Sequence, residues 1–314
     1  MTTVQILNGD CRDVLKTLPD QSVHTCVTSP PYFGLRDYGH TGQMGLEPTP
    51  DEFVSELVNV FREVRRVLRD DGTLWLNIGD SYASYRDGKA TPDTTRGLSE
   101  GTLVPKGSAK NRMSSTFVGT SIKHKDLIGI PWRVAFALQA DGWYLRQDII
   151  WHKPNPMPES VTDRCTKSHE YIFLLSKSPK YYFDHEAIKE PVAASSIIRL
   201  TQPNISAQVG SNRVPFKTNG TMKAVGNTEM RNKRSVWTVT TKPFKGAHFA
   251  TFPQDLIEPC ILAGCPEGGT VLDPFGGAGT TGLVAKRNNR NAILIELNSE
   301  YVEIIKNRTD GVFE

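Results

Sequence analysis

The sequence lacks the features that are typical of membrane proteins, of disulfide-bonded proteins and of zinc-binding proteins. No apolar run reaches the length needed to cross a bilayer, and the start Met1-Thr2-Thr3-Val4 does not have the shape of a signal peptide. The five cysteines are odd in number, none forms a Cys-x-x-Cys pair, and no pattern beside Cys260 and Cys265 suggests zinc. We therefore expect a cytoplasmic protein with reduced, buried cysteines and no bound metal.

What the sequence does contain is a rigid polar turn, Ser29-Pro30-Pro31-Tyr32, just after the apolar run Val23–Val27. This context predicts a turn at the carboxyl edge of a buried parallel strand, where open α/β sheets bind their ligands. The two prolines remove two backbone donors and fix φ, so the carbonyl groups of Ser29 and Pro30 are free to accept from an amino group. Tyr32 offers an aromatic face above a flat ring. Taken alone, the segment also fits an ordinary proline-rich loop.

A second motif, at residues 269–281, reads as a strand, a glycine turn and the start of a helix that Thr280 or Thr281 would cap. A further strand, Asn291–Ile295, ends at Glu296, and an acid in that position suits hydrogen bonds to ribose hydroxyls. The preceding Asp273-Pro274-Phe275 distinguishes the glycines from the dinucleotide fingerprint, and no Gly-Lys-Ser/Thr follows as in a P-loop. An ordinary tight turn is the alternative interpretation.

Positive charge is concentrated in two polar segments. Residues 185–245 hold ten Lys and Arg against three Asp and Glu, and residues 84–125 hold eight against three, whereas the whole chain has a net charge of +3. Basic charge gathered in this way is what a phosphate-binding surface requires, although solvated flexible loops can have the same composition.

Hydrophobic spacing predicts an α/β fold. Residues 51–69 form the clearest amphipathic helix, and its apolar stripe is expected to face the core. His169–Leu175 and Tyr181–Asp184 are expected to pair as a hairpin. Further helices are predicted at Ile130–Ala140, Leu256–Ala263 and Tyr301–Arg308, and further strands at Val4–Leu7, Thr73–Ile78 and Leu145–Trp151.

In this order, the motifs resemble those of the S-adenosylmethionine-dependent DNA amino-methyltransferases, which modify exocyclic nitrogens. The resemblance is to their β group, of the Ser-Pro-Pro-Tyr type, in which the catalytic tetrapeptide precedes the cofactor-binding region. Residues 84–125 and 185–245 carry no matching motif. Supporting matches are Gly9-Asp10-Cys11, Leu18–Val23, Trp151–Pro158, His169–Tyr171, Tyr181–Asp184 and His248–Pro253.

The resemblance implies a Rossmann-like class I methyltransferase sheet with helices on both faces, a circularly permuted motif order and an inserted target-recognition region. Residues 1–184 would form the catalytic part of the core, with a mobile basic loop at about 84–125. Residues 185–245 would be the target-recognition insertion, and residues 246–314 the cofactor-binding part of the same core.

The resemblance also implies S-adenosyl-L-methionine as cofactor and double-stranded DNA as substrate, with the target base flipped out of the duplex. Ser29, Pro30, Pro31 and Tyr32 would be catalytic, because the Ser29 hydroxyl and Pro30 carbonyl accept the amino N–H bonds and Tyr32 stacks on the base. The residues expected to bind the cofactor are Asp10, Phe252, Pro253, Asp273, Phe275, Gly276, Gly277, Gly279, Thr280 and Glu296.

Basic and aromatic side chains supply the expected DNA contacts, although the sequence does not sort phosphate contacts from base contacts. The candidates are Arg36, Lys153, Arg213, Lys217, Arg231, Lys233, Arg234 and Trp237. The resemblance leaves open a homodimer, a cognate restriction endonuclease as partner, and a bacterial or phage source.

Within the resembling family, Ser at the first tetrapeptide position is most associated with N4-cytosine methylation, and Asp or Asn with N6-adenine. We therefore predict methyl transfer to the exocyclic N4 of a cytosine. N6-adenine methylation with the same fold is the alternative, because Ser and Asp both accept from an amino group. Methyltransferases of RNA or protein glutamine are more distant alternatives, since they normally place the cofactor motif first. A catalytically silent DNA-binding regulator would be expected to lose Asp273, the glycines or Tyr32, and all of these are present.

Overall fold

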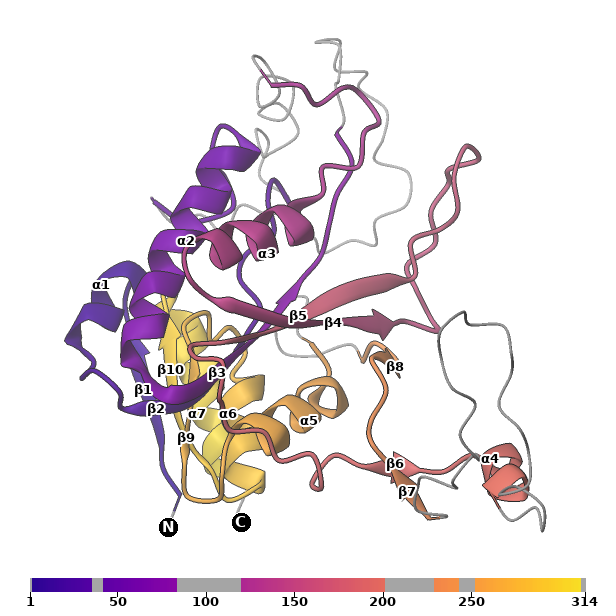
Figure 1. Cartoon of the computed structure of the whole chain (residues 1–314). Coiled ribbons are helices and arrows are strands. Elements are labelled where there is room, and N and C mark those ends of the chain that lie inside the picture. Colours follow the sequence, from indigo (N-terminus) through magenta and orange to yellow (C-terminus); the bar gives the residue numbers. More distant parts are fainter. Residues whose placement is uncertain (1, 36–41, 84–119, 201–228, 243–251, 312–314) are drawn as a thin grey trace. The chain divides into compact units, whose positions relative to one another are not determined.

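The structure is a computed structural model that describes residues 2–35, 42–83, 120–200, 229–242 and 252–311 (Figure 1). It divides into two compact units, one formed by Met1–Phe183 with Ser235–Glu314 and the other by Asp184–Arg234. Most of the basic loop expected at about 84–125 lies outside the described residues. None of the described helices is long and apolar enough to span a membrane.

The larger unit is built on a mixed sheet whose described strands follow the order β1-β10-β9-β2-β3-β5-β4-β8. The first five are parallel to one another, and β5 runs antiparallel between β3 and β4. The bounds are β1 Val4–Asn8, β2 Val23–Thr28, β3 Leu68–Ile78, β4 Tyr144–His152, β5 His169–Ser176, β8 Val236–Thr238, β9 Thr270–Asp273 and β10 Asn291–Glu296.

Strand β2 lies near the middle of this sheet, between β3 and β9. Its residues from Thr25 to Thr28 are all buried, as expected for a parallel strand covered on both faces. Cys26 is in register with Leu272 of β9, so a strand from the start of the chain pairs with one from its end. This pairing confirms the fold class predicted from the sequence and brings the two predicted motifs to adjacent strands.

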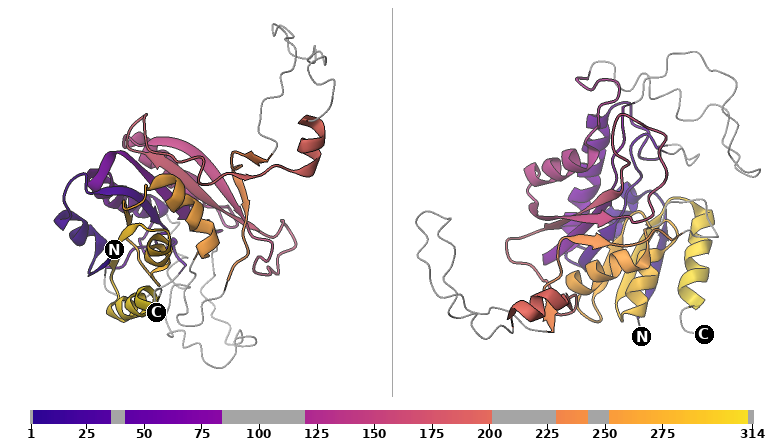
Figure 2. Two further views of the ribbon diagram at one scale, coloured as in Figure 1. Left: turned by 90° about the horizontal axis from the view of Figure 1, so that it is seen from below. Right: turned by 90° about the vertical axis from the view of Figure 1, so that its right-hand side faces the viewer.

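Helices cover both faces of the sheet (Figure 2). Helices α1 (Cys11–Thr17), α2 (Pro50–Val67) and α3 (Ile130–Ala140) pack against one another on one face, and α5 (Gln254–Gly264), α6 (Thr280–Arg287) and α7 (Ser299–Asp310) on the other. Helix α2 begins with a capping box, in which the Thr49 hydroxyl accepts from the Glu52 N–H and the Glu52 carboxylate accepts from the Thr49 N–H. Its buried stripe confirms the amphipathic helix predicted at this position.

The hairpin predicted between His169–Leu175 and Tyr181–Asp184 is wrong. Strand β5 is paired on one side with β3 and on the other with β4, so neither of its edges is open to a third strand. Residues 181–183 are irregular instead, and the Phe183 ring stacks on Trp75 with 6.1 Å between ring centroids. Phe183, one of the aromatic residues that suggested a strand, therefore packs against the sheet instead.

The smaller unit holds a short antiparallel pair, β6 (Glu190–Pro191) with β7 (Met230–Arg231), and helix α4 (Ala194–Leu200). The Glu190 carboxylate lies 2.9 Å from Arg231 Nε and 3.0 Å from Arg234 Nε. One acid thus pairs with two of the basic residues that the sequence marks as DNA contacts.

The buried face of α2 gives a direct test of the packing. Phe61 is fully buried in the core, so Phe61→Ala should lower the free energy of unfolding by about 3–5 kcal/mol through lost burial and the cavity left behind. Ser55 is exposed on the same helix, and Ser55→Ala should change it by less than about 0.5 kcal/mol. Urea unfolding followed by circular dichroism compares the two. Equal effects would contradict the packing of α2 described here.

Candidate active site

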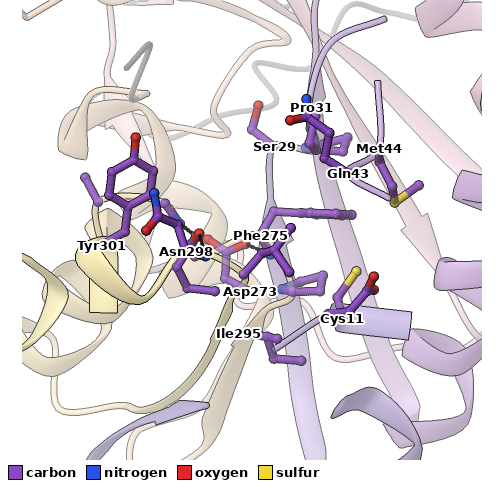
Figure 3. A pocket seen from close by; sticks show the side chains of 18 of the residues that line it. Cys11, Ser29, Pro31, Gln43, Met44, Asp273, Phe275, Ile295, Asn298 and Tyr301 are labelled. Atoms are coloured by element: carbon purple, nitrogen blue, oxygen red, sulfur yellow. Dashed lines mark hydrogen bonds between the residues drawn. The ribbon is translucent and has the colours of Figure 1, made fainter. Parts of the chain in front are cut away.

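A pocket opens at the carboxyl ends of β1, β10, β9 and β2, the edge at which α/β sheets bind ligands (Figure 3). Figure 3 shows Ser29 and Pro31 near Gln43 and Met44, with Asn298 and Tyr301 on another side. The remaining lining residues are Gly9, Asp10, Cys11, Arg12, Pro30, Tyr32, Leu35, Gly42, Phe252, Asp273, Pro274, Phe275, Gly276, Gly277, Ala278, Thr280, Ile295, Glu296 and Leu297.

Asp273 joins the two halves of the pocket. Its Oδ1 accepts from Thr28 Oγ1 at 2.6 Å and from the Phe275 N–H at 3.1 Å, and its Oδ2 accepts from Thr281 Oγ1 at 2.6 Å. Burial raises the pKa of Asp273, while these hydrogen bonds act against that rise. Asp273 therefore fixes the glycine turn to the end of β2.

The glycine turn needs backbone conformations and space that other residues lack. Gly277 and Gly279 have φ of 52° and 75°, in the left-handed region that favours glycine. A Cβ on Gly279 would lie 2.8 Å from Ile305 Cγ2, so this residue allows α7 to approach closely. The predicted side-chain cap at the start of α6 is wrong, because Gly279 is the N-cap and Thr281 donates to Asp273.

Glu296 lies at the end of β10 with both carboxylate oxygens already engaged once. Its Oε2 accepts from the Gly277 N–H at 2.7 Å and its Oε1 from the Asn298 N–H at 2.8 Å. Each oxygen keeps a second lone pair for another donor. Burial raises the pKa of Glu296, so its protonation begins above the ordinary pH range for a glutamate.

Asp10 caps helix α1 and pairs with Arg12. Its Oδ1 accepts from the Arg12 N–H at 2.9 Å, and its Oδ2 lies 2.5 Å from Arg12 Nη2. Hydrogen bonds from the Arg12 side chain hold the pKa of Asp10 below its usual value. Arg12 Nη2 also donates to the Gly42 carbonyl at 2.6 Å, which attaches the segment carrying Gln43 and Met44 to the pocket.

The tetrapeptide turn is packed tightly against its neighbours. A Cβ on Gly45 would lie 3.1 Å from the Tyr32 carbonyl oxygen, and the Gly34 N–H donates to the Gly45 carbonyl at 2.7 Å. Pro30 is buried and Ser29 is half-buried. Within the part of the chain that the structure describes, no hydrogen bond engages the Ser29 hydroxyl, which lines the pocket. This oxygen is therefore available to a ligand.

The pocket brings together all four predicted catalytic residues and most of the predicted cofactor-binding residues. Pro253 and Gly279 do not line it; Pro253 is the N-cap of α5. Gln43 and Met44 had no sequence signal, whereas Asn298, two positions after Glu296, is the N-cap of α7 and Tyr301 lies in the first turn of that helix. The start of the helix that follows Glu296 is therefore the sequence signal that points to Asn298 and Tyr301.

The predicted DNA contacts are scattered. Lys153 forms an ion pair with Glu170 inside the larger unit, and Trp237 is only 6% exposed, which leaves little of its surface for DNA. In the smaller unit, Arg231 and Arg234 pair with Glu190, and Lys233 is half-buried. Arg36, Arg213 and Lys217 lie outside the described residues.

Comparison with known proteins identifies the family to which the chain belongs. A family model described as DNA methylase matches residues 23–307. The chain belongs to the DNA methylase family. It is 48% identical over 309 residues to the Type II methyltransferase M.Cfr9I of Citrobacter freundii, covering 98% of this chain and 87% of that protein.

Solved structures agree on the fold of this DNA methylase. The PvuII DNA methyltransferase, named as cytosine-N4-specific, aligns with a TM-score of 0.64 at 19% identity over 98% of this chain and 86% of its own. A putative DNA modification methylase of Thermus thermophilus, complexed with S-adenosyl-L-methionine, aligns with a TM-score of 0.57 at 23% identity over 99% and 95% of the two chains. The methyl donor of this family is S-adenosyl-L-methionine.

The pocket fits that cofactor. Asp10, Asp273 and Glu296 supply three carboxyl groups against the single guanidinium of Arg12, a balance that suits a ligand with a sulfonium cation. Phe275 and Ile295 provide apolar surface beside the unused lone pairs of Glu296. The pocket therefore offers apolar surface for the adenine ring of the cofactor and hydrogen-bond acceptors for its ribose.

Cofactor affinity should depend on pH through Glu296. We propose that the Glu296 carboxylate accepts from ribose hydroxyls. Because its pKa is raised, this carboxylate is lost as pH falls toward and below that pKa, and affinity should fall by up to about tenfold per pH unit there. Isothermal titration of S-adenosyl-L-methionine between pH 8 and pH 5 measures this. Glu296→Gln should bind more weakly at neutral pH with a flatter profile. An equally steep profile in the variant would assign the titration to another group.

Proposed function

We propose that this DNA methylase transfers a methyl group to the exocyclic N4 of a cytosine in duplex DNA. The observation that carries the proposal is the Ser29 hydroxyl, available in the cofactor pocket at the first position of a Ser-Pro-Pro-Tyr turn. Ser at this position is what the resemblance associates with cytosine N4. Asp273 ties the same turn to the glycines that follow β9.

The chemistry asks these residues to polarise a weak nucleophile. The lone pair of an exocyclic amino group is delocalised into the ring, so acceptors for its two N–H bonds shift electron density onto the nitrogen. We assign that role to the Ser29 hydroxyl oxygen and the Pro30 carbonyl oxygen, as positioning and electrostatic stabilisation. Ser29 is a poor base, so the proton leaves with or after methyl transfer. When bound, S-adenosyl-L-methionine supplies the methyl group from its sulfonium.

The target nitrogen is out of reach inside a duplex, so the base must leave the stack. Tyr32 is the aromatic residue that the turn presents beside Ser29, and we assign it as the surface on which the flipped base stacks. Stacking fixes the plane of the base, while Ser29 and Pro30 select its amino edge.

The Type II methyltransferase relatives support a role in modification beside a cognate restriction endonuclease. We propose that residues 185–245 carry target recognition. This is supported by the compactness of Asp184–Arg234 as a unit of its own and by its cluster of basic residues near Arg231.

Nucleoside mass spectrometry tests the reaction. Plasmid DNA incubated with the protein and S-adenosyl-L-methionine should yield N4-methyldeoxycytidine, and Ser29→Ala should lower turnover by about a hundredfold while cofactor affinity stays within about twofold. N6-methyldeoxyadenosine would contradict cytosine as the target base but would leave the assignment of the active-site residues unchanged. Unchanged turnover in Ser29→Ala would remove Ser29 from the mechanism. Absence of both products on DNA of varied sequence would favour RNA or protein as the substrate, or a protein that binds DNA without methylating it.

The recognition role of the smaller unit predicts a salt effect. Lys233→Gln with Arg234→Gln should weaken DNA binding and reduce the slope of log affinity against log salt by about one for each lost phosphate contact. Arg231 is left intact because it lies in the β6–β7 ladder and its side chain is only 27% exposed, whereas the Arg234 side chain is 70% exposed. Lys16→Gln with Lys306→Gln, two exposed lysines of the larger unit, is the matched control. Equal slopes in the two double variants would contradict the proposal.

A further inference from the structure

A half-buried carboxylate accepts a hydrogen bond from the hydroxyl of Tyr32, the proposed stacking residue. Tyr32 Oη donates to Glu170 Oε2 at 2.7 Å. Glu170 belongs to β5, at the start of the antiparallel strand, 138 positions away from Tyr32 in the chain. Its side chain is only 15% exposed, although neither the predicted site nor the pocket lining includes it.

The same carboxylate has two further donors. Glu170 Oε1 accepts from Lys153 Nζ at the end of β4, and Oε2 also lies 3.4 Å from Asn77 Nδ2 of β3. The Lys153 ammonium in turn lies 4.2 Å from the centroid of the Trp151 ring. These donors compensate the charge of a carboxylate that is largely removed from water. Donors from β3 and from the end of β4, the two strands that flank β5, therefore converge on the carboxylate that receives the Tyr32 hydroxyl.

The Tyr32 ring is also confined from the side by Gly79. A Cβ at Gly79 would lie 2.6 Å from Tyr32 Cε2 and 3.2 Å from Cδ2 and Cζ, which is closer than van der Waals contact allows. The glycine does not have positive φ, so its value here is the space it leaves for the ring rather than its backbone freedom. The Tyr32 ring is thus held at one edge by close packing on Gly79 and at its hydroxyl by the hydrogen bond to Glu170.

We propose that Glu170 is a positioning residue for methyl transfer, which holds the Tyr32 ring in the orientation needed to stack on the flipped base. This rests on the proposed function, because it takes Tyr32 as the surface for the base. A ring held before the base arrives loses no rotamer freedom when the base stacks, so the anchor favours the reactive geometry. Lys153 is accordingly the partner that keeps Glu170 compensated, rather than a DNA contact.

The test is a double-mutant cycle on kcat, measured as transfer of labelled methyl groups to plasmid DNA. Tyr32→Phe keeps the ring and removes the hydroxyl, and Glu170→Ala removes its acceptor; each should lower kcat by about tenfold. The double variant should be no slower than the slower single variant, because both remove the same anchor. Glu170→Gln, whose amide oxygen still accepts from Tyr32, should recover most of the rate.

Two other readouts distinguish positioning from a general structural effect. The dissociation constant for S-adenosyl-L-methionine and the melting temperature should stay close to wild type in Tyr32→Phe, and Gly79→Ala should lower kcat by displacing the ring. Glu303→Gln, which loses an exposed ion pair with Lys306, is the matched control and should match wild type.

Additive losses in the cycle, an unchanged kcat in Tyr32→Phe, or a fall in kcat matched by an equal loss of cofactor affinity would overturn the role of Glu170. The proposed function fails separately, through a wild-type protein that transfers no methyl group to DNA or transfers it to adenine.

Discussion

The buried hydrogen bonds of Asp273 are the contacts on which the site depends. Thr28 closes strand β2, Asp273 closes strand β9, and Thr281 lies in the first turn of α6; a single carboxylate accepts from both threonine hydroxyls. Because Thr28 directly precedes Ser29, the same contact sets where the tetrapeptide begins relative to the glycine turn. Residues that are 245 positions apart in the chain therefore form one pocket.

The mixed sheet adds a second constraint on the opposite side of β2. Parallel strands β1, β10, β9 and β2 end together and form the side of the pocket that we propose for the cofactor. Beyond β3 the antiparallel strand β5 begins at that same edge, so Glu170 near its start lies where the parallel strands end. The reversal of one strand is what brings a carboxylate to the Tyr32 hydroxyl. A fully parallel sheet would place the start of that strand at the other edge.

Local pattern was sufficient for the parts of the fold whose chemistry is contained in neighbouring residues. The stripe of α2 and the apolar run of β2 follow from spacing alone, and the Asp273 and Glu296 motifs gave most of the pocket. The failures concern contacts between distant segments. Tyr181–Asp184 looked like a strand because it is rich in aromatic residues, but Phe183 packs on Trp75 instead. Thr281 looked like a helix cap, but in the folded turn its hydroxyl donates to Asp273. Gln43 and Met44 reach the pocket through Arg12, which no local pattern encodes.

Basic residues that look alike in the sequence differ in what a DNA contact would require of them. The Lys153 side chain is only 19% exposed, and turning it outward would leave the half-buried Glu170 carboxylate without its cation, which is unfavourable. Arg234 is 70% exposed, and its pair with Glu190 contributes about 0–1 kcal/mol, so a phosphate can compete for the same guanidinium. Burial of the basic side chain itself, rather than the number of nearby charges, therefore separates internal cations from those that DNA can engage.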